Sequence, residues 1–193
     1  MKTNEPRKRL SKEERRQQIL DSAMKVFIKK GYNGATTLEI AKEADVSEVT
    51  LFRYFSSKKE IFMEGIEPIL ITTLKESIVS VSGLQAIDKL KYILKDRIKL
   101  ISDHHEVIKL ILMESQVNPE VANINYIGTI ASLLKESIQD TGVELKNEDT
   151  SLRLLMGSIL SFLYLQEVDE SKIEQFIDSL IMIIKEINNY EVF

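Results

Sequence analysis

The sequence predicts an all-α protein, with a small three-helix head at the N-terminus and a larger helical body, about nine helices in total. Glycine and proline are scarce, at 7 and 3 of 193 residues, so long helices meet few breaks. Apolar residues recur at three- and four-residue steps, the period of a helix with one buried face. Ser or Thr followed three residues later by Glu, the capping box of a helix start, precedes several of these apolar runs.

Composition narrows the class of protein. The chain is 44% hydrophobic and 29% charged, which is typical of a globular protein. It has no cysteine, which excludes disulfides and thiolate chemistry. The N-terminal stretch has no apolar core of a secretory signal, and the longest uncharged run, 154–166, is too short to span a membrane. We therefore expect a soluble, cytoplasmic protein that does not bind membranes.

The charge is distributed unevenly. Residues 1–60 hold 14 Lys and Arg against 9 Asp and Glu, whereas the remainder holds 12 against 21. A basic head on an acidic body favours a nucleic-acid-binding module joined to a solvated domain, although chance asymmetry of a solvated surface would give the same pattern.

The first element expected is a flexible basic arm over residues 1–10, with Arg7, Lys8 and Arg9 at its end. Such an arm lies along DNA phosphates or enters the minor groove, or it is a solvated tail with no fixed contact.

A long helix then begins at the capping box of Ser11 and Glu14 and continues to about Lys30. Gly31 is a helix stop, and Tyr32 is expected in the core of the head. The apolar face of this helix consists of Ile19, Leu20, Ala23, Val26 and Phe27.

Two short helices with a tight corner follow and complete the head, which spans residues 11–57. Thr36 and Glu39 form the capping box of the first, residues 44–46 make the corner, and Ser47 is the N-cap of the second. Helix, short turn, helix is the geometry that places a second helix in the major groove of DNA. The sequence therefore predicts a helix-turn-helix DNA-binding head.

This stretch resembles the DNA-binding head of the TetR (TetR/AcrR) family of bacterial transcriptional regulators. The family pattern runs roughly T-x-x-x-I-A-x-x-A-G-V-S-x-x-T-L-Y-x-H/Y-F-x-S-K-x-x-L, and the resemblance covers about the first third of the chain. The residues in register are Thr36 or Thr37, Ile40, Ala41, Ala44, Val46, Ser47, Thr50, Leu51, Tyr54, Phe55, Ser57 and Lys58.

Three residues depart from the pattern. Asp45 replaces the usual glycine at a left-handed backbone position, which Asp tolerates better than most residues. Val49 replaces a residue that is often small, and Phe52 replaces a tyrosine and lacks its hydroxyl. These departures change the expected pattern of base reading and leave the motif intact.

The resemblance implies which residues contact DNA. The predicted contacts are Thr36, Thr37, Ser47, Glu48, Val49, Thr50, Arg53, Tyr54 and Lys58. Amides near Thr36 take a phosphate, and the first residues of the second helix face base edges. Arg53 reaches guanine or phosphate, whereas Tyr54 and Lys58 clamp phosphates. Glu48 has a second interpretation, as an exposed charge that matches the positive end of the helix.

The body, residues 58–193, begins with a helix expected over 58–81, in which Pro68 either bends the helix or marks a boundary. The next helix, 84–102, has one apolar stripe with Arg97 at its edge, where a guanidinium is paired or lines a cavity. His104 and His105 point about 100° apart on a helix and make a poor metal pair, so no metal or other cofactor is expected.

The last two helices are expected to form the assembly surface, because the family commonly forms homodimers through a four-helix bundle. The helix starting at Glu148 is apolar nearly all round, and a cap of Ser171 and Glu174 opens a final helix with a broad apolar stripe. The predicted interface residues are Gly157, Ser161, Phe176, Leu180 and Ile184. An internal core with no partner is the alternative.

The resemblance also implies a pocket for a small-molecule effector, apolar or amphipathic, in the body. The candidate lining residues are Tyr92, Arg97, Met113, Glu114, Tyr126, Met156 and Phe162. Each has the alternative interpretation of an ordinary core residue.

The function implied is a dimeric DNA-binding regulator, a repressor that an effector releases from an inverted-repeat operator. The alternative on the same fold is a DNA-binding protein without ligand control, such as a chromosome-organising or division factor. An enzyme is not expected, because the sequence offers no cysteine, no Gly-rich phosphate loop and only two adjacent histidines.

Overall fold

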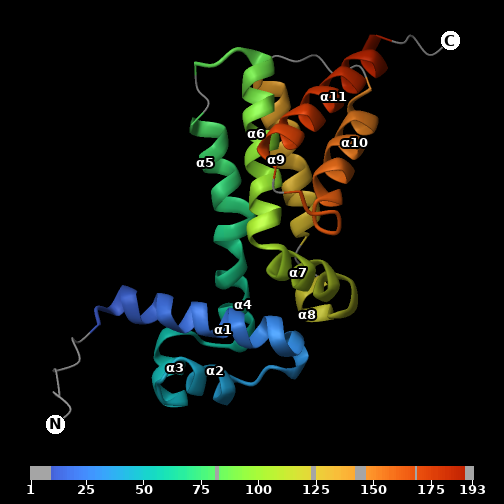
Figure 1. The fold of residues 1–193 in the computed structure, drawn as a ribbon. Helices are drawn as coiled ribbons and strands as arrows, with labels where there is room; N and C mark the ends of the chain where they lie inside the picture. Colours follow the sequence, from blue (N-terminus) through green and yellow to red (C-terminus); the bar gives the residue numbers. More distant parts are fainter. Residues whose placement is uncertain (1–9, 81–82, 123–124, 142–146, 168, 190–193) are drawn as a thin grey trace. The chain divides into compact units, whose positions relative to one another are not determined.

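The computed structural model describes residues 10–80, 83–122, 125–141, 147–167 and 169–189. These residues form α-helices and one π-helical turn and contain no strand, which confirms the all-α prediction (Figure 1). The first helices are α1 (Lys12–Gly34), α2 (Thr37–Glu43), α3 (Glu48–Tyr54) and α4 (Lys58–Glu67), followed by the π turn η1 (Pro68–Thr72). The later helices are α5 (Thr73–Ser80), α6 (Ala86–Asp103), α7 (His105–Val117), α8 (Pro119–Ala122), α9 (Tyr126–Thr141), α10 (Glu148–Ser161) and α11 (Glu170–Asn189).

The helix count differs from the prediction. The described residues hold eleven α-helices rather than about nine. The stretch expected as one helix over 58–81 is divided by η1, and α8 is a short helix separate from α9. None of the described helices combines the length and apolar character that crossing a membrane requires.

The chain divides into two compact units, one up to Ile66 and one from Glu67 on. The sequence had placed this boundary after Ser57. The later boundary has a packing reason, because Phe62 of α4 lies edge-on against Phe27 and Tyr32, with ring centroids 5.1 Å from each. All of α4 except its last residue therefore belongs to the head.

The helix caps and the tight corner of the head are formed as the sequence predicted. Ser11 and Glu14 make the reciprocal capping box of α1, and Thr36 and Glu39 make that of α2. Gly31 has φ 72° and ψ 171° and interrupts the helical backbone of α1. Asp45 has φ 51°, so the left-handed corner predicted from its place in the pattern is confirmed.

The capping box that the Ser-x-x-Glu spacing of Ser57 and Glu60 predicts, and the cap predicted at Ser171, are both corrected. The Ser57 hydroxyl accepts from the amide of Glu60 at 3.1 Å, but the Glu60 carboxylate accepts from the amide and hydroxyl of Ser56 at 2.5 Å. At the start of α11 the carboxylate of Asp169 accepts from the amide of Ser171 at 2.9 Å and takes the capping place that the sequence had assigned to Ser171.

Pro68 neither breaks the helix nor leaves it regular. It begins η1, in which the amide of Thr73 donates to the carbonyl of Pro68 five residues earlier, and α5 follows directly. Proline has no amide to donate to the preceding turn, so the regular hydrogen-bond pattern of the helix is interrupted at Pro68.

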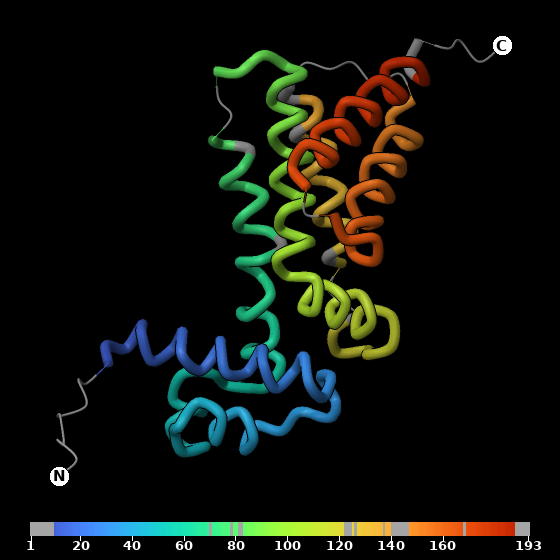
Figure 2. Tube along the Cα trace, viewed as in Figure 1, coloured from blue at the N-terminus to red at the C-terminus, as the bar shows by residue number. Residues whose placement is uncertain are grey.

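In the body, α6 is the central helix and contacts α5, α7, α9, α10 and α11 (Figures 1 and 2). Its predicted apolar stripe is buried at Leu90, Leu94, Ile98 and Ile101. The final helix, α11, is amphipathic and buries Ile173, Ile177, Leu180, Ile181 and Ile184.

Candidate DNA-binding surface and body cavity

The short helix α3 presents one face to solvent and buries the other. Leu51 and Phe55 are fully buried, as expected for core residues of the head. Val49 is 68% exposed, Phe52 is 48% exposed, and Arg53 is exposed as well. A helix that is fixed by one face and offers the other is what reading a DNA groove requires.

Hydrogen bonds link the starts of α2 and α3. The hydroxyl of Thr37 donates to the carboxylate of Glu48 at 2.5 Å. The hydroxyl of Ser47 accepts from the amide of Thr50 at 3.1 Å and lies 2.8 Å from the Thr50 hydroxyl. The Thr37–Glu48 bond therefore ties the start of α2 to that of α3, and Glu48 is held by a partner inside the head.

Lys58 has partners that the sequence did not reveal. Its ammonium donates to the carbonyls of Tyr32 at 2.8 Å and Ala35 at 3.1 Å, and it lies 4.4 Å from the centroid of the Tyr32 ring. These contacts fasten the start of α4 to the chain that leaves α1. A phosphate contact by Lys58 stays a prediction, and Tyr54, half-buried at the end of α3, stays a candidate for the same role.

A second cation supports the head from α1. The guanidinium of Arg16 forms an ion pair with Glu64 and lies 4.4 Å from the centroid of the Phe55 ring. Hydrogen bonding to Glu64 raises the pKa of the Arg16 guanidinium above its ordinary value. The ion pair joins α1 to α4, and the same guanidinium contacts the ring of Phe55 at the end of α3.

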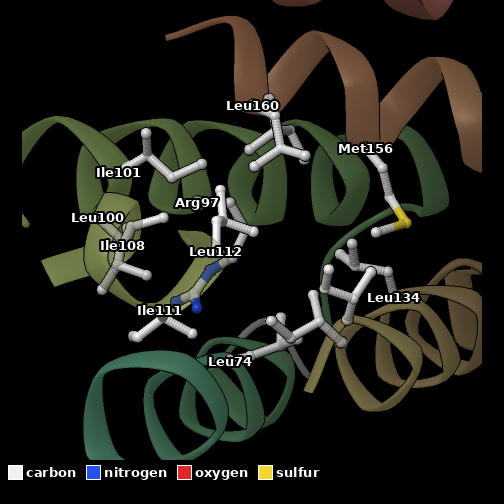
Figure 3. Close-up of a pocket in the computed structure, with 13 residues that line it drawn as sticks. Leu74, Arg97, Leu100, Ile101, Ile108, Ile111, Leu112, Leu134, Met156 and Leu160 are labelled. Atoms are coloured by element: carbon white, nitrogen blue, oxygen red, sulfur yellow. The ribbon is translucent and has the colours of Figure 1, made fainter. Parts of the chain in front are cut away.

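The body contains an apolar cavity of about 100 Å³ among α5, α6, α7, α9 and α10 (Figure 3). Its lining residues are Leu74, Arg97, Leu100, Ile101, Ile108, Ile111, Leu112, Ile127, Ile130, Leu134, Met156, Ile159 and Leu160. All of them are aliphatic or Met except Arg97, so the cavity suits an apolar group.

Arg97 also lines a polar cleft of about 320 Å³ between α5 and α6. The cleft residues are Thr73, Glu76, Ser77, Ser80, Tyr92, Asp96, Arg97, Lys99, Leu100, Asp103 and His104. Of the residues that the structure describes, Arg97 and Leu100 are the two that line both spaces. Arg97 therefore lies between the two spaces, and its hydrogen-bond partners Thr73, Ser77 and Asp96 all line the polar cleft.

The structure brings together some of the predicted effector residues. Arg97 and Met156 line the cavity, and Tyr92 lines the polar cleft. Of those outside both spaces, Met113 is 68% exposed, and Phe162 is buried with its ring centroid 5.1 Å from that of Phe176.

Two further candidates complete the comparison with the prediction. Glu114 is outside the cavity, buried next to Asn118, whose side-chain amide donates to its carboxylate at 3.3 Å. The side chain of Tyr126 lies outside the described part of the structure. The aliphatic lining was missed, because Leu and Ile at helical spacing look the same in a core and in a cavity wall.

The predicted interface residues divide into two groups. Leu180 and Ile184 are 4% and 2% exposed within the single chain, so their assignment to an interface is corrected: they belong to the core of the body. Gly157 faces open space, and a side chain built there would meet no atom within 4 Å. Met182 and Ile183 on α11 are 63% and 51% exposed.

The remaining interface candidates are intermediate. Ser161 and Phe176 are both half-buried, and the Ser161 hydroxyl donates to the carbonyl of Ser158 at 2.6 Å. Among the residues that the structure describes, no group of three or more acidic or His side chains is placed to hold a metal ion.

Comparison with known proteins relates these features to one group. The family model "Bacterial regulatory proteins, tetR family" matches residues 19–64. A curated relative, the uncharacterised HTH-type transcriptional regulator YvkB of Bacillus subtilis, is 26% identical over 162 residues, which is 76% of this chain and 82% of that protein.

Solved structures extend the similarity to the body. A candidate fatty acid metabolism regulator of Clostridium perfringens is 28% identical, with a TM-score of 0.64. The match covers 91% of this chain and 99% of the chain of that regulator. The transcriptional regulator FadR of Bacillus subtilis, solved in complex with stearoyl-CoA, has the same fold, with 20% identity and a TM-score of 0.64 over 87% of this chain and 96% of its own.

Proposed function

The chain belongs to the TetR family of bacterial transcriptional regulators, and from this premise we propose that it is a homodimeric repressor released from an inverted-repeat operator by a small-molecule effector. The observation that carries the DNA-binding part is the exposed face of α3, where Val49 and Arg53 face solvent while Leu51 and Phe55 anchor the helix in the head.

Within this proposal, the residues of the head have different roles. The Val49 side chain and the Thr50 methyl contact thymine methyl groups, and Arg53 contacts guanine or phosphate. Thr36, Thr37, Ser47 and Tyr54 position the head on phosphates, which sets register and carries no sequence preference. Glu48 acts mainly inside the head, because Thr37 already occupies its carboxylate.

The dimer is proposed to form through α10 and α11. Gly157 gives a place where a helix of a second chain approaches closely, and Met182 with Ile183 provides exposed apolar surface on α11. Two heads held by such an interface must place their α3 helices about 34–36 Å apart to enter successive major grooves. A change in that spacing on effector binding would release the operator.

The effector is proposed to be a small apolar or amphipathic molecule that enters the cavity among α5, α6, α7, α9 and α10. The support is the aliphatic lining with one guanidinium. The structurally similar FadR binds stearoyl-CoA, which also joins an apolar chain to an anionic group, so this ligand class is compatible with the fold.

The test is selection of binding sites from random DNA, with each selected site retitrated at two salt concentrations. We expect a short inverted repeat bound at least about a thousandfold more tightly than unrelated DNA. Salt-sensitive binding with no enriched sequence would instead support a chromosome-organising protein without ligand control.

A matched pair of variants assigns the base-reading residue. Val49→Ala should relax the selected sequence at particular bases, because it removes an exposed methyl pair from the face of α3. Val79→Ala, which removes an equally exposed valine from α5, should leave the selected sequence unchanged. An identical site selected by Val49→Ala would exclude Val49 as a base reader.

A further inference from the structure

We propose that Arg97 recognises the anionic head of the effector, and that the effector is a small monocarboxylic acid whose carboxylate replaces that of Asp96 on the Arg97 guanidinium. This inference rests on the proposed effector control and names its ligand class and the contact that changes on binding. It is carried by the position of Arg97, which Figure 3 shows among the residues that line the apolar cavity and which also lines the polar cleft.

The guanidinium is nearly inaccessible, whereas its acidic partner is not. Arg97 donates to Asp96 from Nε at 3.0 Å and from Nη2, and its side chain is 7% exposed against 35% for that of Asp96. A buried guanidinium needs an anion, because an uncompensated charge in an apolar site is strongly unfavourable. Asp96 can leave for the water of the cleft, but Arg97 cannot follow, so only another anion can take its place.

Neighbouring hydroxyls complete the site. The guanidinium donates to Thr73 Oγ1 at 3.1 Å and to Ser77 Oγ at 3.2 Å, and the Ser77 hydroxyl donates to the Asp96 carboxylate. A ligand carboxylate in place of Asp96 would therefore meet the guanidinium fork and a hydroxyl donor. This matches the two oxygens of a carboxylate, which accept two parallel hydrogen bonds from arginine.

The cavity defines the rest of the ligand. Among the described residues that line it, Arg97 alone carries a charge, so the ligand has its acid at one end and an apolar body with no second charge. A volume of about 100 Å³ is smaller than the ~150 Å³ engineered cavity that binds benzene, so the cavity admits only a short apolar chain.

The exchange also reaches another helix. Thr73 and Ser77 lie on α5, whereas Asp96 and Arg97 lie on α6, so the four side chains form the polar link between these two helices. Replacing Asp96 breaks the Ser77–Asp96 hydrogen bond and frees Ser77 to donate to the ligand. Ligand binding thereby changes the hydrogen bonds that connect α5 to α6. The helix α5 begins directly after the π turn.

The experiment compares hexanoate with 1-hexanol, which has the same chain and no charge, by calorimetric titration and thermal shift on the full-length protein. We expect hexanoate to bind at least about tenfold more tightly than 1-hexanol, because a hydrogen bond to a charged group is among the stronger ones. Arg97→Met should abolish this preference while 1-hexanol binding stays the same. Arg153→Met, which removes an exposed arginine paired with Asp149, should leave the preference intact.

Asp96→Asn gives a second measurement that does not depend on the stability of Arg97→Met. Removing the competing carboxylate should tighten hexanoate binding by about tenfold and leave 1-hexanol unchanged. Weaker hexanoate binding in Asp96→Asn would overturn the exchange, and equal binding of hexanoate and 1-hexanol by the natural protein would overturn the acid assignment.

Binding to the selected operator, measured without ligand, separates this inference from the proposed function. If the protein binds the operator and 1-hexanol releases it as well as hexanoate does, effector control stands and the role of Arg97 as the anion-recognising residue is wrong. If no operator is bound at all, the repressor function fails whatever the ligand titrations give.

Discussion

Lys58 offers a direct test of whether a residue in the family pattern acts on DNA or inside the head. Lys58→Met keeps most of the side-chain stem and removes the ammonium. The change deletes donation to the carbonyls of Tyr32 and Ala35 and the contact with the Tyr32 ring. Its effect on the free energy of unfolding can be estimated from these contacts.

A hydrogen bond to a charged group contributes about 1.5–3 kcal/mol, and a cation–π contact at a partly exposed site about 0.5–1 kcal/mol. Lys58 is only partly buried, so water can hydrogen-bond the two carbonyls when the ammonium is removed. The two hydrogen bonds together therefore contribute less to the free energy of unfolding than twice the value for one. We expect Lys58→Met to lower the free energy of unfolding of the head by about 2 kcal/mol.

The assay is urea unfolding followed by circular dichroism, paired with DNA binding at several salt concentrations. Lys59→Met is the control, because it removes the same charge from an exposed neighbour in α4. Both variants lose one positive charge, so a loss of stability seen only in Lys58→Met measures the contacts of the Lys58 ammonium with Tyr32 and Ala35.

The salt dependence distinguishes the two roles. Loss of a phosphate contact reduces the slope of log affinity against log salt by about one unit. If Lys58→Met keeps its stability and loses this unit, Lys58 is a phosphate clamp and the structural reasoning is refuted. If Lys58→Met loses stability and its slope of log affinity against log salt equals that of Lys59→Met, then Lys58 acts within the head.

Two further predictions concern assembly and pH. The double variant Met182→Glu, Ile183→Glu should be a folded monomer in sedimentation. Leu180→Glu should instead unfold the body, because Leu180 is 4% exposed and a buried charge is costly. A folded double variant that stays dimeric would exclude the exposed face of α11 as the dimer interface. The pKa of Glu39 is lowered by its hydrogen bonds to Lys30 and Thr36, so its stabilising effect is complete above the unfolded value of about 4.3 and is lost as the pH falls through the lower folded value. Glu39→Gln should therefore flatten the loss of stability between about pH 5 and 3 in unfolding curves, and an unchanged acid limb would contradict the capping role.

The parts of the head that the sequence predicted are those fixed by neighbours in the chain. A capping box needs only residues three apart, and the left-handed corner at Asp45 depends on one residue and its place in the pattern. The contacts of Lys58 escaped prediction because its acceptors lie 26 and 23 residues earlier, at an exit whose position relative to α4 is set by tertiary packing.

The body was predicted less well for a related reason. Apolar spacing shows that α11 buries one face, but it does not show which apolar residues face the chain's own core and which face outward. Leu180 and Ile184 were assigned to an interface, and the residues beside them, Met182 and Ile183, are the exposed ones. On a helix a shift of two positions turns a side chain by about 200° and a shift of one by about 100°, so within a broad stripe packing decides which residues face the core.

Arg97 is the exception among the cavity residues, because a charge on an apolar stripe signals a site in a way that another leucine cannot. A buried ion pair adds little net stability, since removing two charges from water offsets most of their attraction. Asp96 is moreover the adjacent residue, on a direction about 100° away around the helix, and it keeps contact with the cleft water. An apolar pair would stabilise the fold at least as well as Arg97 and Asp96 do. The ion pair is better explained by the partial exposure of Asp96, which allows another carboxylate to replace it.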